Sequence, residues 1–277
     1  MKFADLHLHT NFSDGTYSPQ ELVRRAAEAG IDCIAVVDHD SVDGIKPAQE
    51  AARSKNIEVI PGIELSCEHN NSEVHILGYF IDYADVKLTD NLAFIRKIRE
   101  ARIYEMVEKL KASKVDIKAE DIFALSATKN VGRMHVAQAL INKGYVSSAG
   151  EAFYKYIGDN SPAYVCGFKL KPKEAIELIA SAKGIPVLAH PYTLGNDELI
   201  VEFIEYGLRG LEVYYPEHTN SKTIFYENMA RQYGLLATGG SDCHGRAKPE
   251  ISIGAVKIPY VLVEKLKEEK EKYEKRQ

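Results

Sequence analysis

Short apolar runs alternate with segments of helical periodicity over residues 3–79. Residues 18–21 (Ser-Pro-Gln-Glu) have the form of a capping box with proline at the first helical position, and they predict a helix that Gly30 ends. The run at 33–37 is apolar without alternation, which is typical of a buried parallel strand. A helix at 47–55 and strands at 57–63 and 74–79 follow. This order, with right-handed crossovers, predicts a parallel sheet.

The pattern changes near residue 85. Apolar residues recur at helical spacing from Leu92 to Leu110, and shorter helices are predicted at 121–125, 133–143 and 148–156. No strand pattern interrupts them before residue 163. We therefore expect an all-helical insert over residues 85–163, far longer than an ordinary loop, and such inserts often form lids over a site.

The α/β alternation resumes after the insert. Strands are predicted at 185–189, 210–214 and 235–238, with helices before and between them. Together with a first strand near the N-terminus this makes seven β units, which favour a closed or nearly closed barrel built from residues 1–84 and 164–277. The tail from Leu262 alternates lysine and glutamate, and a solvated helix is expected there.

Composition narrows the classes of function. The net charge is −5 and no basic block occurs outside the mixed tail, so binding of duplex DNA by a broad basic face is not expected. The chain has no secretory signal and no apolar run long enough for a membrane span. Four widely spaced cysteines without a C-x-x-C pair indicate a reducing cytoplasm and argue against a disulfide framework or a thiolate zinc site.

Histidines and carboxylates gather at the predicted strands. His7 and His9 share one face of the first strand, because alternate side chains of a strand point the same way, and Asp14 follows on an Asp-Gly turn. His39 and Glu64 come at the carboxyl ends of later strands, where parallel α/β sheets carry their chemistry.

In all, six of the nine histidines lie at or beside predicted strand ends, and three carboxylates accompany them; the set is His7, His9, Asp14, His39, Glu64, His75, His190, Asp242 and His244. Nitrogen and carboxylate donors without a thiolate fit Mn²⁺, Fe²⁺ or Zn²⁺ better than Mg²⁺ or Ca²⁺. Nine donors exceed what one ion takes, so we expect two to three divalent transition-metal ions, with Mn²⁺ favoured. Multinuclear sites of this kind clamp a phosphoryl group and activate water.

Four segments in order resemble the motifs of the PHP (polymerase and histidinol phosphatase) superfamily: His7-Leu8-His9, Asp38-His39-Asp40, Ala189-His190-Pro191 and Ser241-Asp242-Cys243-His244. The resemblance implies a distorted seven-stranded (β/α) barrel with a two- or three-metal site. It implies one ion on His7, His9, Glu64 and Asp242, a second on Asp14, His39 and His244, and a third on Glu64, His75 and His190, with Glu64 bridging. Many members have histidine where Asp14 stands, which leaves the metal preference open.

A further segment narrows the resemblance. Residues 131–137 resemble the Gly-Arg-x-His segment of the stand-alone metal-dependent phosphoesterases. That subgroup includes enzymes that hydrolyse the 3′-phosphate of 3′,5′-nucleotide bisphosphates and, in some members, short RNA from its 5′ end. The resemblance therefore implies a phosphatase for nucleotide bisphosphates; the alternatives are a histidinol phosphatase or other small-monoester phosphatase, a 5′–3′ exonuclease on short RNA, and, least favoured, a non-catalytic metal-binding module.

Residues outside the donor set are candidates for binding substrate and moving protons. Arg133, His135 and Lys169 are predicted to bind phosphate, Arg133 because it lies near a predicted helix start where backbone N–H groups favour anions. Asp40 or His218 is a candidate to relay a proton to the leaving oxygen. Two further expectations are that Asp38 orients a metal-bound histidine and that His69 is an ordinary surface residue.

Overall fold

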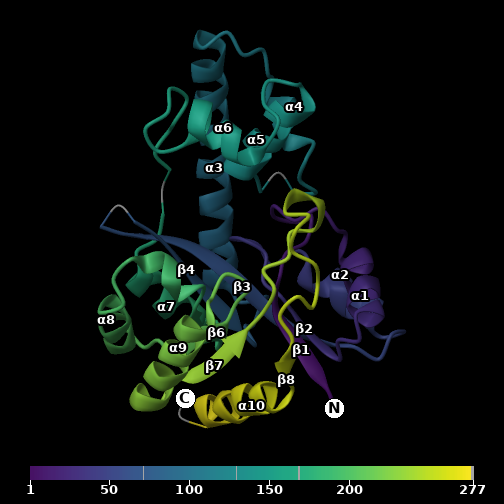
Figure 1. Ribbon diagram of the computed structural model, residues 1–277, viewed down its shortest axis with the longest axis vertical. Coiled ribbons are helices and arrows are strands. Elements are labelled where there is room, and N and C mark those ends of the chain that lie inside the picture. Colours follow the sequence, from purple (N-terminus) through teal and green to yellow (C-terminus); the bar gives the residue numbers. More distant parts are fainter. Residues whose placement is uncertain (71, 129, 168, 276–277) are drawn as a thin grey trace.

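The fold is an α/β barrel, nearly closed, with a helical extension (Figure 1). The computed structural model describes residues 1–277 apart from 71, 129, 168, 276 and 277. Eight strands form one sheet in the order β7-β6-β5-β4-β3-β2-β1-β8. Their bounds are β1 Phe3–Leu8, β2 Cys33–Val36, β3 Glu58–His69, β4 Ser72–Tyr79, β5 Ile185–Leu188, β6 Gly210–Tyr214, β7 Leu236–Gly239 and β8 Ile258–Pro259. A parallel bridge between Leu8 and Cys243 brings the chain after β7 against β1.

The sheet differs from the prediction in two ways. An eighth strand, β8, pairs antiparallel with β1, and its two residues are too few for a periodic signal. The expected parallel order fails at β4, which runs antiparallel to both β3 and β5. The reason is the connection: β3 continues to His69 and β4 begins at Ser72, whereas a parallel crossover needs a dozen or more residues.

Six helices pack around the barrel: α1 Pro19–Glu28, α2 Ile45–Ala52, α7 Pro172–Ser181, α8 Leu199–Glu205, α9 Asn220–Tyr233 and α10 Val261–Glu274. Ser18 caps α1 as predicted, because its side chain accepts the N–H of Glu21 at 3.2 Å. Alternate residues of β2 divide between two apolar clusters, one packed against α1, α2 and α7 and the other filling the barrel interior.

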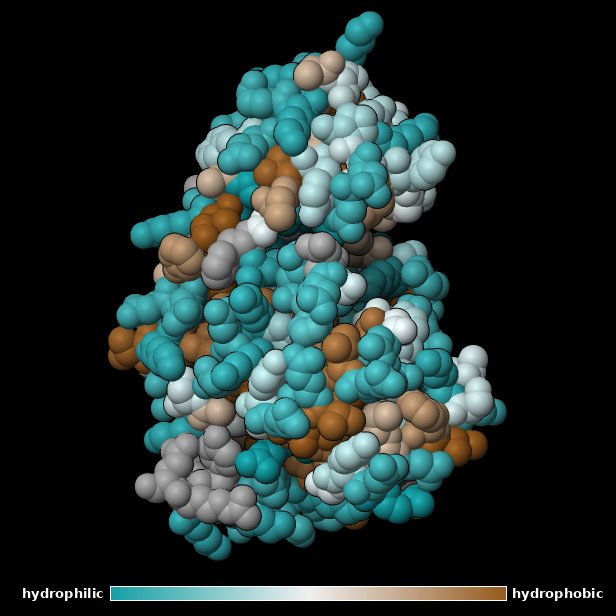
Figure 2. Space-filling view, turned by 90° about the vertical axis from the view of Figure 1, so that its left-hand side faces the viewer, coloured by the Kyte–Doolittle hydropathy of each residue, from teal (hydrophilic) through white to brown (hydrophobic). Residues whose placement is uncertain are grey.

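The C-terminal helix is not the freely solvated helix that its charges suggested. Val263 and Leu266 of α10 are fully buried in the interior cluster, so α10 closes the bottom of the barrel (Figure 1). The Lys/Glu alternation describes only its outer face. No helix within the described ranges has the length and apolar character of a membrane span, and the face drawn in Figure 2 is mostly hydrophilic, with small separate apolar patches.

The segment between β4 and α7 is helical, as predicted. It comprises α3 Val86–Ala112, α4 Ala119–Phe123, α5 Arg133–Asn142, α6 Ala149–Ala152 and the π-helical turn η1 Phe153–Ile157. Helix α3 rises from the barrel, and α4 to α6 pack about its far half (Figure 1). Leu88 and Leu92 near its start belong to the barrel's apolar cluster, whereas Ile103 and Met106 belong to a separate cluster within the insert. A single helix therefore joins the two cores.

Candidate metal centre

Glu64 lies at the centre of the predicted donor set. Its Oε2 is 3.2 Å from Nε2 of both His7 and His9 and 3.4 Å from Nδ1 of His39. Its Oε1 is 2.9 Å from Nδ1 of His75 and 3.2 Å from Nε2 of His190. The Glu64 side chain is only 1% exposed. One buried carboxylate thus meets five imidazoles, which is the position a bridging ligand requires.

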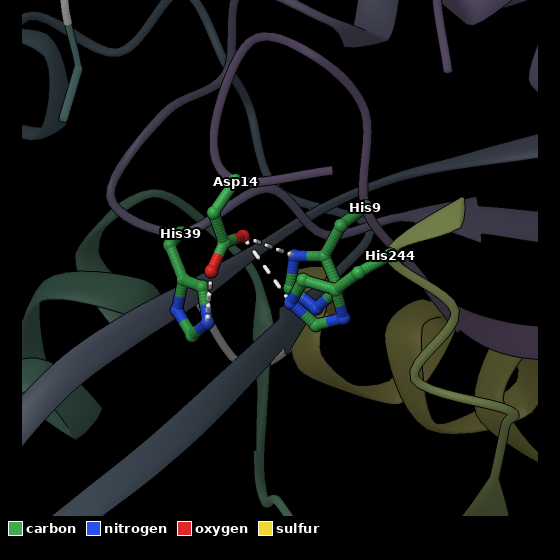
Figure 3. Close-up of side chains that lie close together, drawn as sticks. All are labelled: His9, Asp14, His39 and His244. Carbon is green, nitrogen blue, oxygen red and sulfur yellow. Dashed lines mark ion pairs between the residues drawn. The ribbon is translucent and has the colours of Figure 1, made fainter. Parts of the chain in front are cut away.

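The donors form three overlapping groups. In each, ligand atoms lie within 4.8 Å of one another; the groups are His7, His9, Glu64 and Asp242; His9, Asp14, His39 and His244; and His39, Glu64 and His75. The second is drawn in Figure 3, where Asp14 points toward three imidazoles from the segments that directly follow β1, β2 and β7. His190 adjoins the third group, with its Nε2 3.3 Å from Nδ1 of His75. All nine predicted donors therefore meet in one place.

Unusual backbone conformations place the two donors His190 and Asp242 at the site. Asp242 and His190 both adopt positive φ angles, of 54° and 28°, which are uncommon for non-glycine residues. Gly240 lies so close to β1 that a Cβ there would be 2.3 Å from the backbone nitrogen of His7. Glycine at this position lets the chain after β7 approach β1 and places Asp242 beside His7 and His9.

The cluster has the unsatisfied donors of a metal site. Both ring nitrogens of His9, Nδ1 of His39 and Oδ1 of Asp14 are buried without a hydrogen-bond partner among the residues that the structure describes. His9 Nε2 lies 3.1 Å from Asp242 Oδ1 but lacks hydrogen-bond geometry. Buried polar atoms are normally paired, and imidazole with carboxylate is the donor mixture of Mn²⁺, Fe²⁺ and Zn²⁺ sites. The residues fit divalent transition-metal ions.

In the absence of metal ions, the pKa values of His7 and His9 are raised, so both imidazoles are protonated at pH 7. Burial opposes charging of His9, but the carboxylates of Asp242 and Glu64 outweigh it and raise the pKa of His9 to about 9. In the same way Glu212 and Glu64 raise the pKa of His7 well above its usual value despite burial. Burial also works against the charge of Glu64, yet the facing histidines hold the pKa of its carboxyl well below the usual range.

We predict that ion binding at pH 7 displaces these protons. Ligation needs neutral imidazoles, so loading metal-free protein with Mn²⁺ should release more than one proton per chain, and affinity should rise as the pH approaches about 9. Calorimetric titration in buffers of different ionisation enthalpy measures this directly. Binding heats that do not depend on the buffer would contradict the prediction.

The same pKa shift fixes how the stability of the metal-free protein depends on pH. A histidine whose folded-state pKa is raised stabilises the fold fully below its unfolded pKa of 6.5, and that contribution disappears as the pH rises through the folded value of about 9. The metal-free form should therefore lose stability over the range in which its metal affinity increases.

A buried carboxylate that the sequence analysis missed supports the donors from behind. Glu212, fully buried on β6, has Oε1 2.8 Å from His7 Nδ1, and its Oε2 accepts the His190 N–H at 2.8 Å. Holding Nδ1 leaves Nε2 of His7 to face Glu64. The available signal was a glutamate inside the apolar run 210–214.

Removing this support should weaken metal binding. Glu212→Ala is expected to lower metal affinity roughly 10- to 100-fold, as loss of a carboxylate behind a ligating histidine commonly does. Competition with a chelator measures it. The control is Glu227→Ala on the outer helix α9, where Glu227 accepts a hydrogen bond from the hydroxyl of Tyr214 on β6. If the Glu212→Ala variant bound metal as tightly as wild type, Glu212 would not be a support for the metal ligands.

Asp38 does not orient a histidine, contrary to the expectation. Its two oxygens accept from the Thr10 backbone N–H at 2.7 Å, the Thr10 hydroxyl at 2.6 Å and the Ser13 hydroxyl at 2.6 Å. Asp38 therefore fixes the loop that presents Asp14. Two further groups hold Asp242, whose Oδ2 accepts from Tyr215 Oη at 2.9 Å and from Lys248 Nζ at 3.0 Å.

A cavity of about 400 Å³ opens beside the donors. One part of its lining, called here the first wall, carries His39, Glu64, His190 and His244. Another part, the second wall, carries cationic side chains of the insert and the segment after it: Arg99, Arg102, Arg133 and Lys169. A negatively charged group held by ions on the first wall would thus share the cavity with the cations of the second wall.

Comparison with known proteins agrees with this arrangement. The PHP domain family model matches residues 5–157, more than half of the chain. The chain belongs to the PHP domain family. A 5′-3′ exoribonuclease of Haemophilus influenzae is 35% identical over 245 residues, covering 87% of this chain and 89% of that protein. A 3′,5′-nucleoside bisphosphate phosphatase of Chromobacterium violaceum is 31% identical over 256 residues, covering 90% of each.

A solved structure is similar over nearly the whole chain. A candidate metal-dependent phosphoesterase from Bifidobacterium adolescentis superposes with a TM-score of 0.88 at 30% sequence identity, covering 95% of this chain and 94% of that one. The full-length likeness and the buried donor cluster make this PHP protein a metal-dependent phosphoesterase.

The structure places the predicted phosphate-binding residues on the second wall. Arg133 forms ion pairs with Glu73 at 3.0 Å and Asp159 at 2.5 Å, and Lys169 lies 3.3 Å from the same Glu73. Both therefore share a carboxylate. Arg102, which was not predicted, has no carboxylate partner in the described part of the chain, and its Nε donates to the Val165 carbonyl at 2.8 Å. Burial, with Arg133 and Arg99 nearby, lowers the pKa of Arg102.

The two residues predicted to relay a proton, Asp40 and His218, lie outside the three donor groups. The Asp40 carboxylate pairs with Arg99 of α3 and accepts the Ser66 N–H at 3.0 Å, so both of its oxygens are engaged. His218 lies behind Tyr192 and Tyr215, with Nδ1 bonded to the Val213 carbonyl at 2.8 Å and Nε2 unpartnered. His69 is half-buried against Phe203, away from the donors.

Proposed function

We propose that this PHP protein hydrolyses a phosphate monoester and that its substrate is a 3′,5′-nucleotide bisphosphate, from which it releases the 3′-phosphate. The reaction would use two to three bound divalent ions, with Mn²⁺ favoured over Fe²⁺ or Zn²⁺. One observation carries the proposal: seven of the nine donors and three arginines of the insert line the same cavity. A substrate with two phosphates would use both walls.

The donor wall would hold the ions and the reacting phosphate. The sets His7, His9, Glu64 and Asp242, and His9, Asp14, His39 and His244, are suited to one ion each, and Glu64 with His75 and His190 to a third. When bound, such ions supply positive charge to the phosphoryl oxygens and lower the pKa of water. The protein's part is to fix these donors in place, with Glu64 at the centre of the five imidazoles.

The second wall would bind the non-reacting phosphate. Arg102 offers a guanidinium without a carboxylate partner among the described residues, and Arg133 lies close enough to affect its pKa. A second anion would neutralise this cationic group, and guanidinium–phosphate pairs are strong and directional. We accordingly assign residues 85–163 to substrate recognition and residues 1–84 and 164–277 to the metal-binding barrel.

The two residues predicted to relay a proton, Asp40 and His218, are suited to different roles. Asp40 is better suited to anchoring α3 through Arg99 than to moving a proton, because both oxygens are engaged. His218 keeps an unpartnered Nε2, and burial lowers its pKa, so a neutral ring would be present at pH 7. Proton transfer by His218 stays a prediction.

A 5′–3′ exonuclease acting on short RNA is the second candidate. It is favoured by the likeness to the Haemophilus influenzae exoribonuclease, and a chain of phosphates would also suit a cationic wall. A histidinol phosphatase would have no use for that wall, because its substrate carries one phosphate.

The experiment is side-by-side turnover of adenosine 3′,5′-bisphosphate, histidinol phosphate and a 5′-phosphorylated RNA trimer by Mn²⁺-loaded protein. The proposal expects 5′-AMP and phosphate from the bisphosphate at the highest kcat/KM. Preferred release of mononucleotides from the trimer would favour the exonuclease, and preference for histidinol phosphate would overturn both. Inactivity on a broad phosphoester panel at full metal occupancy would indicate a non-catalytic module.

A further inference from the structure

We propose that the insert is a structural part of the metal centre, and that Asn130 and His135 are positioning residues for the ion bound by Asp14 and His39. The proposal rests on the metal centre described above and goes beyond it. The residues concerned are 126–128 and 130–135, called here the clamp segment, which join α4 to the start of α5.

The clamp segment holds the loop that presents Asp14. Three consecutive carbonyls just before Asp14 each accept a hydrogen bond from it: Asn11 O from Ala127 N–H at 2.9 Å, Phe12 O from the Thr128 hydroxyl at 3.2 Å, and Ser13 O from His135 Nε2–H at 2.8 Å. On its other side, the loop is held by Asp38 of the barrel. Asp14 is thus fixed between the insert and the barrel.

The ring of His135 is committed to this task. Its Nδ1 accepts the Gly132 N–H at 3.1 Å, and a carbonyl can only accept, so Nε2 carries the hydrogen that bonds Ser13 O. The residue is only 5% exposed. Both nitrogens are therefore engaged with backbone, and a phosphate contact, as predicted from sequence, would require one of these bonds to break.

Asn130 makes the corresponding contact to a second donor. Its Nδ2 donates to the backbone carbonyl of His39 at 2.6 Å, and the residue is 3% exposed. That bond sets the orientation of the amide and leaves Oδ1 buried without a partner at the cavity. Asn130 therefore fixes the backbone of His39 from the side opposite Glu64.

These contacts fall on Asp14 and His39. Both belong to the set with His9 and His244, and His39 also belongs to the group with Glu64 and His75. In contrast, His7, Glu64 and Asp242 come from β1, β3 and the segment after β7. Loss of the clamp contacts should therefore weaken the ion bound by Asp14 and His39 and spare the ion held by His7, His9, Glu64 and Asp242.

The test is metal binding rather than turnover. Mn²⁺ binding to the full chain is followed by calorimetry and by metal content after dialysis, for wild type, His135→Ala and Asn130→Ala. We expect the affinity for at least one ion to fall roughly tenfold or more in each variant, while at least one ion, the one assigned to His7, His9, Glu64 and Asp242, binds as tightly as in wild type. Should His135→Ala fail to fold, Asn130→Ala gives the same reading through His39.

Two further variants separate positioning from general destabilisation. His135→Gln can place an N–H near the position of Nε2 and should restore most of the lost affinity. Gln138→Ala, on the same helix but bonded only to Asn142, should bind metal as wild type does. Unchanged affinity in both alanine variants, or failure of His135→Gln to restore it, would overturn the inference. A wild-type protein that binds no ions would instead refute the metal centre.

Discussion

Replacing Glu64 by alanine should abolish phosphoester hydrolysis and remove more than one metal ion. Glu64 contacts five imidazoles and belongs to two of the three donor groups, so its loss opens more than one set at once. Several kcal/mol of transition-state charge stabilisation would be lost, which corresponds to a fall in kcat of roughly a thousandfold or more. Metal content and kcat are measured on the same preparations.

The control for this substitution is His69→Ala. His69 also lies on β3 but contacts Phe203 away from the donors, so metal content and turnover should both match wild type. A Glu64→Ala protein that keeps its full metal content would show that Glu64 is not a bridging ligand.

Replacing Arg102 by alanine should change which substrates the enzyme prefers. If Arg102 binds the non-reacting phosphate, kcat/KM for a nucleotide bisphosphate should fall by about 1.5–3 kcal/mol, the usual value of a charged hydrogen bond, or roughly 10- to 150-fold. p-Nitrophenyl phosphate has no second phosphate, so its kcat/KM should change less than about threefold. Arg133→Ala is expected to change substrate preference in the same way, lowering kcat/KM for the bisphosphate more than for p-nitrophenyl phosphate.

Arg96→Ala is the matched control for the cationic wall. Arg96 lies on the same helix, pairs with Asp43 at 2.6 Å and does not line the cavity. Its loss should leave the ratio of the two substrates unchanged. Equal losses on both substrates in Arg102→Ala would mean that Arg102 serves the reacting phosphate or the fold, and the two-phosphate substrate would lose its main support.

The sequence was informative where chemistry follows strand periodicity. His7 lies on β1 and His9 directly after it, both facing Glu64, and His39 follows β2, so the meeting of these histidines on one rim could be predicted. Glu64 was expected at the end of a strand, but it lies within β3, which continues to His69. His75 and Glu64 come together only through the antiparallel pairing of β3 and β4, which the parallel prediction missed. Strand periodicity was thus enough to find His7, His9 and His39. His75 was assigned by resemblance to the family, because its position depends on the direction in which β3 and β4 pair.

The second wall and the supporting contacts were harder to foresee. Arg99 and Arg102 are two of many charged residues on α3, and helical periodicity does not say which turn faces the barrel. Glu212 is one carboxylate in an apolar strand, and His135 looked like a phosphate ligand because Ser13, whose carbonyl it binds, is far away in sequence. Long-range contacts of this kind follow from packing of the insert on the barrel rather than from any local pattern.

The most direct test of the metal centre is a crystal structure of the Mn²⁺-loaded protein with anomalous scattering measured at the manganese edge. We predict two to three anomalous peaks, with Glu64 within about 2.0–2.3 Å of at least two of them. His7, His9 and Asp242 should surround one peak, and Asp14, His39 and His244 another. Absence of any peak within bonding distance of Glu64 in active, metal-loaded crystals would contradict it.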